Sequence, residues 1–112
     1  MAKDDYPVIV YQILSYLYQC IKLGETPRVD YLRHDGKLFQ INKKYWTFIL
    51  INLKKDGLIR NIIIDEVLRE EIIEGLENIQ ITSKGIEYLT ENSFIQKARS
   101  FLKEIKDIAP FV

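Results

Sequence analysis

A change of hydrophobic period at Gly57 constrains the fold more than any other feature of the sequence. Before it, four large apolar residues recur at helical spacing: Trp46, Ile49, Leu50 and Leu53. They predict a helix that Asn42 caps and that runs to Asp56. After Gly57, residues 58–64 form a short run rich in β-branched side chains, which is typical of a strand. The pattern therefore predicts a helix that ends at a left-handed glycine and leads directly into a buried strand.

Two further helices are predicted upstream of this junction. Asp5 and Gly24 mark the two ends of the first, and its wide apolar face indicates that it is covered on more than one side. Thr26 as N-cap and Pro27 as first helical residue predict a short second helix that fades near Gly36. A connector of about five residues then leads to the third helix.

The segment after the strand permits several readings. Residues 65–70 form a charged tip. The return strand is residues 71–74, residues 78–82, or both, with Gly75 as a bulge. A short helix over residues 67–74 is a competing prediction, because Leu68 and Ile72 are four positions apart.

Two helices are predicted at the C-terminal end. Thr82 or Ser83 caps the first of them, and its Ile86 and Leu89 point inward. The second covers residues 93 to about 108 and carries a narrow apolar seam: Phe94, Ala98, Phe101, Ile105 and Ile108. This seam either packs on the first helix or forms a homodimer contact.

The order of these elements predicts a winged helix-turn-helix with a β-hairpin wing and an added C-terminal helix. The expected fold class is α+β and mostly helical. A length of 112 residues predicts a single domain, residues 1–112.

Residues 79–92, Ile-Gln-Ile-Thr-Ser-Lys-Gly-Ile-Glu-Tyr-Leu-Thr-Glu-Asn, place a strand end, a capping threonine and a glycine in a compact turn. This segment, with Lys103-Glu104-Ile105-Lys106-Asp107, resembles the YjcQ-like family of small bacterial and phage proteins. The resemblance implies a winged-helix-like fold and no established biochemical activity. It supplies no catalytic residues.

The charge distribution favours nucleic acid at one end of the molecule. The chain has 16 basic and 16 acidic residues, which excludes a generally basic binder. Residues 22–60 nevertheless carry nine basic and four acidic residues, a net charge of +5, while residues 65–91 carry −6 from two basic and eight acidic residues. The candidate contacts with double-stranded DNA lie in the basic part: Lys43, Lys44, Tyr45 and Thr47 at the start of the third helix, with Arg28 and Lys37 near the backbone. The expected role is an accessory transcriptional regulator of phage or mobile-element origin.

The alternative prediction is a protein-interaction or dimerisation domain. An outward Phe48 and Ile51 are unusual for reading bases and are more typical of a protein contact. The apolar residues Phe94, Phe101 and Ile105 of the last helix offer a second such surface. The acidic hairpin would be repelled by phosphates and suits a basic partner.

An enzyme, a cofactor and a metal site are not expected. One cysteine and one histidine cannot form a Cys/His metal cluster, and no Gly-rich phosphate loop is present. Cys20 is expected to be a buried small hydrophobic residue, and His34 a solvated turn residue. The chain shows neither a signal-peptide pattern nor a membrane-spanning run, so a soluble cytoplasmic protein is expected.

Overall fold

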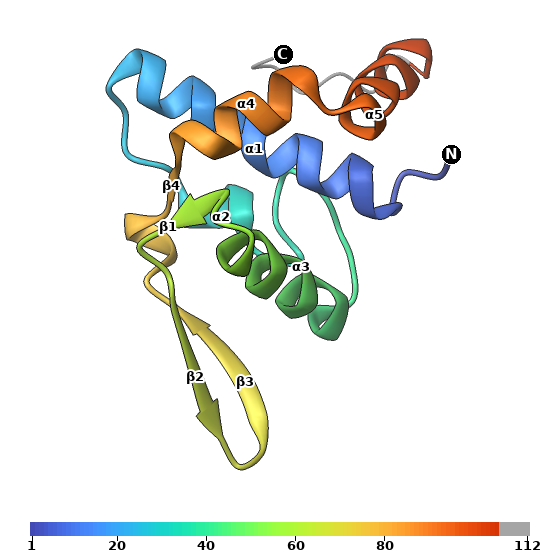
Figure 1. Ribbon diagram of the computed structural model, residues 1–112. Helices are drawn as coiled ribbons and strands as arrows, with labels where there is room; N and C mark the ends of the chain where they lie inside the picture. Colours follow the sequence, from blue (N-terminus) through green and yellow to red (C-terminus); the bar gives the residue numbers. More distant parts are fainter. Residues whose placement is uncertain (106–112) are drawn as a thin grey trace.

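The computed structural model describes residues 1–105, and its elements follow the predicted order (Figure 1). They are α1 (Tyr6–Leu23), α2 (Val29–Leu32), α3 (Lys43–Lys55), β1 (Ile59–Arg60), β2 (Ile63–Val67), β3 (Glu70–Glu74), a 3₁₀ turn η1 (Leu76–Asn78), β4 (Gln80–Ile81), α4 (Ser83–Glu91) and α5 (Ser93–Glu104). Three helices followed by an antiparallel hairpin form a winged helix-turn-helix, and α4 and α5 are added at its C-terminal side. The predicted α+β, mostly helical fold is confirmed.

The core is built around α1. This helix contacts α4, α5 and β4, so it is covered on several sides, as its wide apolar face predicts. Four of its large side chains are completely buried: Ile9, Ile13, Leu14 and Leu17. Gly24 ends the helix with a positive φ of 67°, and its amide bonds to carbonyls of the last turn. Asp5 occupies the N-cap position, but its carboxylate accepts from the amide of Ala2 instead of capping the helix.

The second helix is shorter than predicted. It begins at Val29, and not at Pro27, because the extended backbone of Arg28 donates its amide to the hydroxyl of Tyr16 over 2.7 Å. Only one turn of helix remains before the loop that leads to α3.

The third helix has the predicted bounds and the predicted inward face. The carboxamide oxygen of Asn42 accepts from the amides of Lys44 and Tyr45, which is the expected N-cap. The four predicted inward residues are buried: Trp46, Ile49, Leu50 and Leu53. The indole nitrogen of Trp46 donates to the carbonyl of Leu32 over 2.8 Å, and this buried bond ties α3 to α2.

The single strand predicted over residues 58–64 is interrupted. Asn61 adopts a positive φ of 74°, which asparagine tolerates better than most residues, and the chain changes direction there. As a result β1 pairs with β4, whereas β2 pairs with β3 in a separate hairpin. Both candidate return segments therefore form strands. The competing helix over residues 67–74 is wrong, and Gly75 starts the turn η1 instead of forming a bulge.

A clamp between two turns closes this region, and we call it the Thr82 clamp. The hydroxyl of Thr82 donates to the carbonyl of Gly57 over 2.5 Å and accepts from the amide of Gly85 over 3.0 Å. The amide of Thr82 donates to the carbonyl of Leu58 over 3.0 Å. A Cβ atom on Gly85 would collide with the Leu58 carbonyl and would lie 2.7 Å from Cγ1 of Ile81. The start of α4 thus rests directly on the Gly57–Leu58 turn that follows α3.

The β2–β3 hairpin projects from the helical body (Figure 1). Its tip is formed by Leu68 and Arg69, which both have positive φ, 52° and 65°. This is the pattern of a type I′ turn, for which Asn-Gly is the favoured sequence. The two residues at the tip are therefore strained, since L-residues other than Gly, Asn and Asp rarely adopt this conformation.

The last helix packs on α1, and the predicted seam takes part in this packing only in its middle. Ala98 of the seam is buried and Phe101 is half-buried against the core, while Phe94 is 61% exposed. The neighbouring Ile95 and Leu102 complete the buried side. The predicted seam residue Ile108 and the predicted extension to residue 108 lie outside the described residues.

The collision at Gly85 predicts a stability effect. We expect Gly85→Ala to lower the free energy of unfolding by about 2 kcal/mol or more, because the backbone of Leu58 must move to admit the methyl group. Gly24→Ala is the matched control. It has open space around it but a positive φ, so it costs about 1 kcal/mol through strain alone. Urea unfolding measures both, and equal losses for the two variants would contradict the close approach.

The strained tip predicts that the hairpin can be stabilised. We expect Leu68→Asn with Arg69→Gly to slow amide hydrogen exchange in β2 and β3 at least about tenfold, because the positive φ values are then easily adopted. Leu68→Ala keeps the strain and should leave exchange unchanged. Equal exchange rates in the double variant and the natural chain would show that the tip is relaxed.

Candidate nucleic-acid interface

Two lysines stand free at the N-terminal end of α3. Lys43 and Lys44 are exposed, and neither has an ion pair within residues 1–105. The Asn42 side chain already occupies the amides of Lys44 and Tyr45, so these amides do not offer the usual helix-end site for an anion. If a phosphate approaches here, its attraction depends on the two ammonium groups, which act as point charges.

Tyr45 and Thr47, also predicted as contacts, are engaged within the molecule. The hydroxyl of Tyr45 donates to the carbonyl of Asp4 over 2.7 Å, and the hydroxyl of Thr47 donates to the carbonyl of Lys43 over 2.9 Å. Burial, together with the charges of Asp4 and Asp5, raises the pKa of the Tyr45 phenol. The donor capacity of both hydroxyls is therefore used before any base could approach.

Arg28 and Lys37 form a separate group around Asp30. Arg28 makes two bonds to the Asp30 carboxylate, 3.1 and 3.2 Å, and the ammonium of Lys37 lies 3.6 Å from it. Desolvation acts to raise the pKa of Asp30, but Arg28 and Lys37 outweigh it and the pKa is lowered. Both cations also lie over the ring of Tyr31, at 5.4 and 5.5 Å from its centre. Asp30 partly neutralises them, so this group attracts phosphate less than two free cations would.

The outward row of α3 differs from its prediction at Ile51. Lys44, Phe48, Ile51 and Lys55 recur at helical spacing, but Ile51 is only 6% exposed, where α3 lies against β3 of the hairpin. The prediction that Phe48 and Ile51 are both exposed is therefore wrong for Ile51. Phe48 is 56% exposed, and its ring forms an edge-to-face pair with the ring of Tyr6, with the two ring centres 6.2 Å apart. We call Lys44, Phe48 and Lys55 the outer face of α3.

The hairpin beside α3 is acidic. Five carboxylates and one basic residue lie between residues 63 and 74, a net charge of −4. All five carboxylate residues are exposed, so their charges face solvent. A phosphate backbone would be repelled by this wing, which differs from the basic wings that suit DNA.

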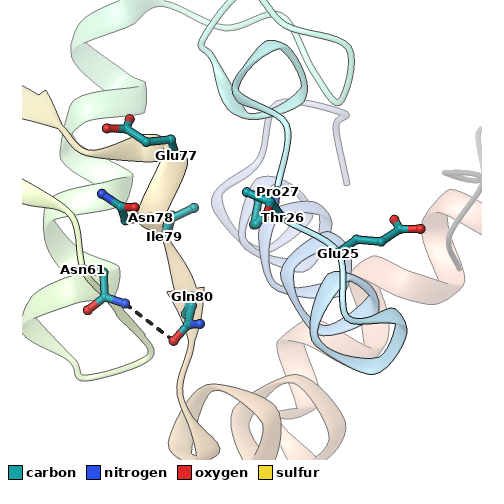
Figure 2. Close-up of a pocket in the computed structure, with 8 residues that line it drawn as sticks. All are labelled: Glu25, Thr26, Pro27, Asn61, Glu77, Asn78, Ile79 and Gln80. Carbon is teal, nitrogen blue, oxygen red and sulfur yellow. Dashed lines mark hydrogen bonds between the residues drawn. The ribbon is translucent and has the colours of Figure 1, made fainter.

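Two open depressions lie near these elements. Figure 2 shows the first, of about 580 Å³, between the α1–α2 loop and the segment η1–β4. Its lining is mainly polar: Glu25, Thr26, Pro27, Asn61, Glu77, Asn78, Ile79 and Gln80. Asn61 donates to Gln80 across 3.5 Å, and Glu25 points away from the other side chains in this view. The second, of about 600 Å³, adjoins the start of α3 and includes Asp4, Asp35 and Tyr45. Neither gathers a set of basic groups.

The remaining residues considered in the sequence lie either at the surface of α5 or inside the molecule. Phe94 and Ile105 are exposed and Phe101 is half-buried, so all three remain available at the surface of α5 or beside it. Cys20 is buried as predicted, and burial raises the pKa of its thiol. His34 is half-buried rather than solvated, with Nδ1 3.3 Å from the carbonyl of Ile41 and its ring beside Trp46.

Two absences hold for residues 1–105. No helix there is both long enough and apolar enough to cross a membrane. No three His, Cys, Asp or Glu side chains in that part of the chain are grouped so that they could hold a metal ion.

The sequence reasoning missed the part that the N-terminal segment plays in this site. Asp4 binds Tyr45 and Tyr6 touches Phe48, so residues 4–6 lie along α3. No local pattern marks these contacts, because they join positions about forty residues apart. The only available signal is the clustering of tyrosines in the first helix, which indicates a widened contact surface.

Comparison with known proteins identifies a family for this chain. The family model described as YjcQ protein matches residues 11–108, which is most of the chain. No curated protein matches, and no solved structure does. The matched range includes the helix-turn-helix, the hairpin and the Thr82 clamp. On this evidence of sequence, the chain belongs to the YjcQ protein family.

Proposed function

We propose that this protein binds double-stranded DNA through the N-terminal end of α3 and acts, without catalysis, as an accessory transcriptional regulator of phage or mobile-element origin. One observation carries the proposal. Two adjacent, exposed lysines, without an ion pair among residues 1–105, lie at the start of the helix that occupies the recognition position of a winged helix-turn-helix. Lysines at this place neutralise phosphates when the helix approaches the major groove.

The engaged side chains around these lysines define the kind of binding. Tyr45 and Thr47 donate inside the molecule, and Arg28 and Lys37 share Asp30. Phosphate contacts would therefore contribute most of the affinity, while direct reading of bases would be weak. The acidic hairpin would be directed away from the duplex, since its carboxylates repel phosphates.

A protein-interaction role is the second candidate. It is favoured by exposed aromatic and aliphatic side chains that a monomer usually covers: Phe48, Phe94 and Ile105 are 56%, 61% and 39% exposed. Phe94 lies within reach of Lys97, whose ammonium is 5.5 Å from the ring centre. These surfaces lie on α3 and at α5, on elements that also carry lysines.

A salt titration tests DNA binding. We expect the affinity for a random-sequence duplex to fall steeply with salt, and Lys43→Glu with Lys44→Glu to weaken binding on all sequences. Because two phosphate contacts are lost, the slope of log K against log salt should become shallower by about 2. Fluorescence anisotropy of a labelled duplex measures both quantities.

The matched control is Lys97→Glu with Lys103→Glu on α5, which changes the net charge equally at a distance from α3. It should retain most of the affinity. No binding to any duplex at low salt would refute the proposal, and so would equal losses in the two double variants, because binding would then follow net charge alone.

A further inference from the structure

The β2–β3 hairpin has one face that its own molecule does not cover. Successive side chains of a strand point to opposite faces, so the register assigns six residues to one face: Ile63, Asp65, Val67, Glu70, Ile72 and Glu74. We call these six the outer hairpin face. Each of its cross-strand pairs joins one apolar side chain and one carboxylate, as Ile63 pairs with Glu74 and Val67 with Glu70.

The exposure of this face is unusual for apolar residues. Ile63, Val67 and Ile72 are 57%, 46% and 37% exposed. On the opposite face the directly paired Ile64 and Ile73 are half-buried, and Ile73 packs against the core. The inner face therefore holds the hairpin to the body, whereas the outer face presents a regular apolar and acidic surface to solvent.

The hairpin is poorly stabilised by its own chain. A two-stranded hairpin is marginal in water, and this one places Glu66 directly opposite Glu71. Its tip is strained at Leu68, which is also 93% exposed. The arm extends beyond the helical body (Figure 1), so it can reach the surface of another molecule.

The outer face of α3 has the complementary chemistry. Lys44 and Lys55 flank the exposed ring of Phe48, and that face carries no carboxylate. Neither lysine has an ion pair within the described residues. An apolar centre between two cations matches a surface on which apolar side chains alternate with carboxylates.

We propose that two copies of this chain pair reciprocally, with the outer hairpin face of each seated on the outer face of α3 of the other. Such an arrangement is closed and two-fold symmetric, and it makes the same contact twice. Self-pairing of two hairpins is disfavoured, since carboxylates would meet carboxylates. The pairing covers Lys44, so the dimer is the form in which α3 is closed to DNA. The dimer itself does not depend on the proposed DNA binding.

Sedimentation velocity without DNA tests the pairing. We expect a monomer–dimer equilibrium at low salt, in which the dimer becomes detectable as the protein concentration is raised to about 1 mM. Added salt should dissociate the dimer. A chain that stays monomeric over this range at low salt would overturn the proposal, whether or not it binds DNA.

Charge reversal locates the interface. Glu70→Lys with Glu74→Lys on the outer hairpin face should abolish the dimer. The matched control, Glu66→Lys with Glu71→Lys, makes the same charge change on the inner face of the same hairpin and should preserve it. Equal loss of dimer in both variants would overturn the assignment of the face.

A mixing experiment makes the test independent of folding defects. Lys44→Glu with Lys55→Glu should also be monomeric alone. An equimolar mixture of this variant with Glu70→Lys/Glu74→Lys should restore the dimer, because both reciprocal contacts again join opposite charges. Only correctly folded chains can restore it. A mixture that stays monomeric would contradict the pairing of the hairpin with α3.

Discussion

The hydrogen bonds of Thr82 to the Gly57–Leu58 turn are the contact on which the rest of the structure depends. Its hydroxyl and amide hold two carbonyls that lie 25 and 24 positions earlier in the chain. The segment between them contains the whole wing, so these bonds, together with the pairing of β1 with β4, close a long loop and offset the entropy that its closure costs. Gly85 permits the close approach because no side chain intervenes.

A second buried bond fixes the other end of α3. The indole of Trp46 binds the carbonyl of Leu32, which holds the helix against a second helix of only one turn. Since the apolar side of α3 is fixed at both ends, its lysines must face outward. The acidic and basic parts of the chain thus lie on different elements, and α3 is positioned to meet a charged partner. The lysines and the acidic arm beside them are the charges that a proposed partner would meet.

Local signals predicted the elements well because they depend on neighbouring residues. Asn42 and Gly24 marked helix ends through capping and left-handed geometry, and the spacing of Trp46 and Leu50 identified the buried side of α3. The strand break at Asn61 was missed. Asparagine is depleted in strands and tolerates a positive φ, but a single asparagine inside a β-branched run does not show that the two halves of the run pair with different strands.

Contacts between distant segments explain the errors at the site. Ile51 has the spacing of an exposed residue but is buried, on a helix that contacts β3 of the hairpin. Tyr45 was predicted as a DNA contact, but its hydroxyl donates to the carbonyl of Asp4 in the N-terminal segment. In α5, Ala98 of the predicted seam is buried but Phe94 is exposed, because the contact with α1 also takes in the neighbouring Ile95 and Leu102. Periodicity predicts a face but does not identify what covers it.

Native-state hydrogen exchange tests the central role of the Thr82 clamp most directly. If the clamp closes the fold, the amides of Thr82 and Gly85 exchange only through global unfolding, at rates that match the buried turns of α1 around Leu14. The amides of β2 and β3 should exchange faster through local opening of the arm. Exchange of Thr82 and Gly85 at the rate of the hairpin amides would contradict the account, because the wing would then open without unfolding the core.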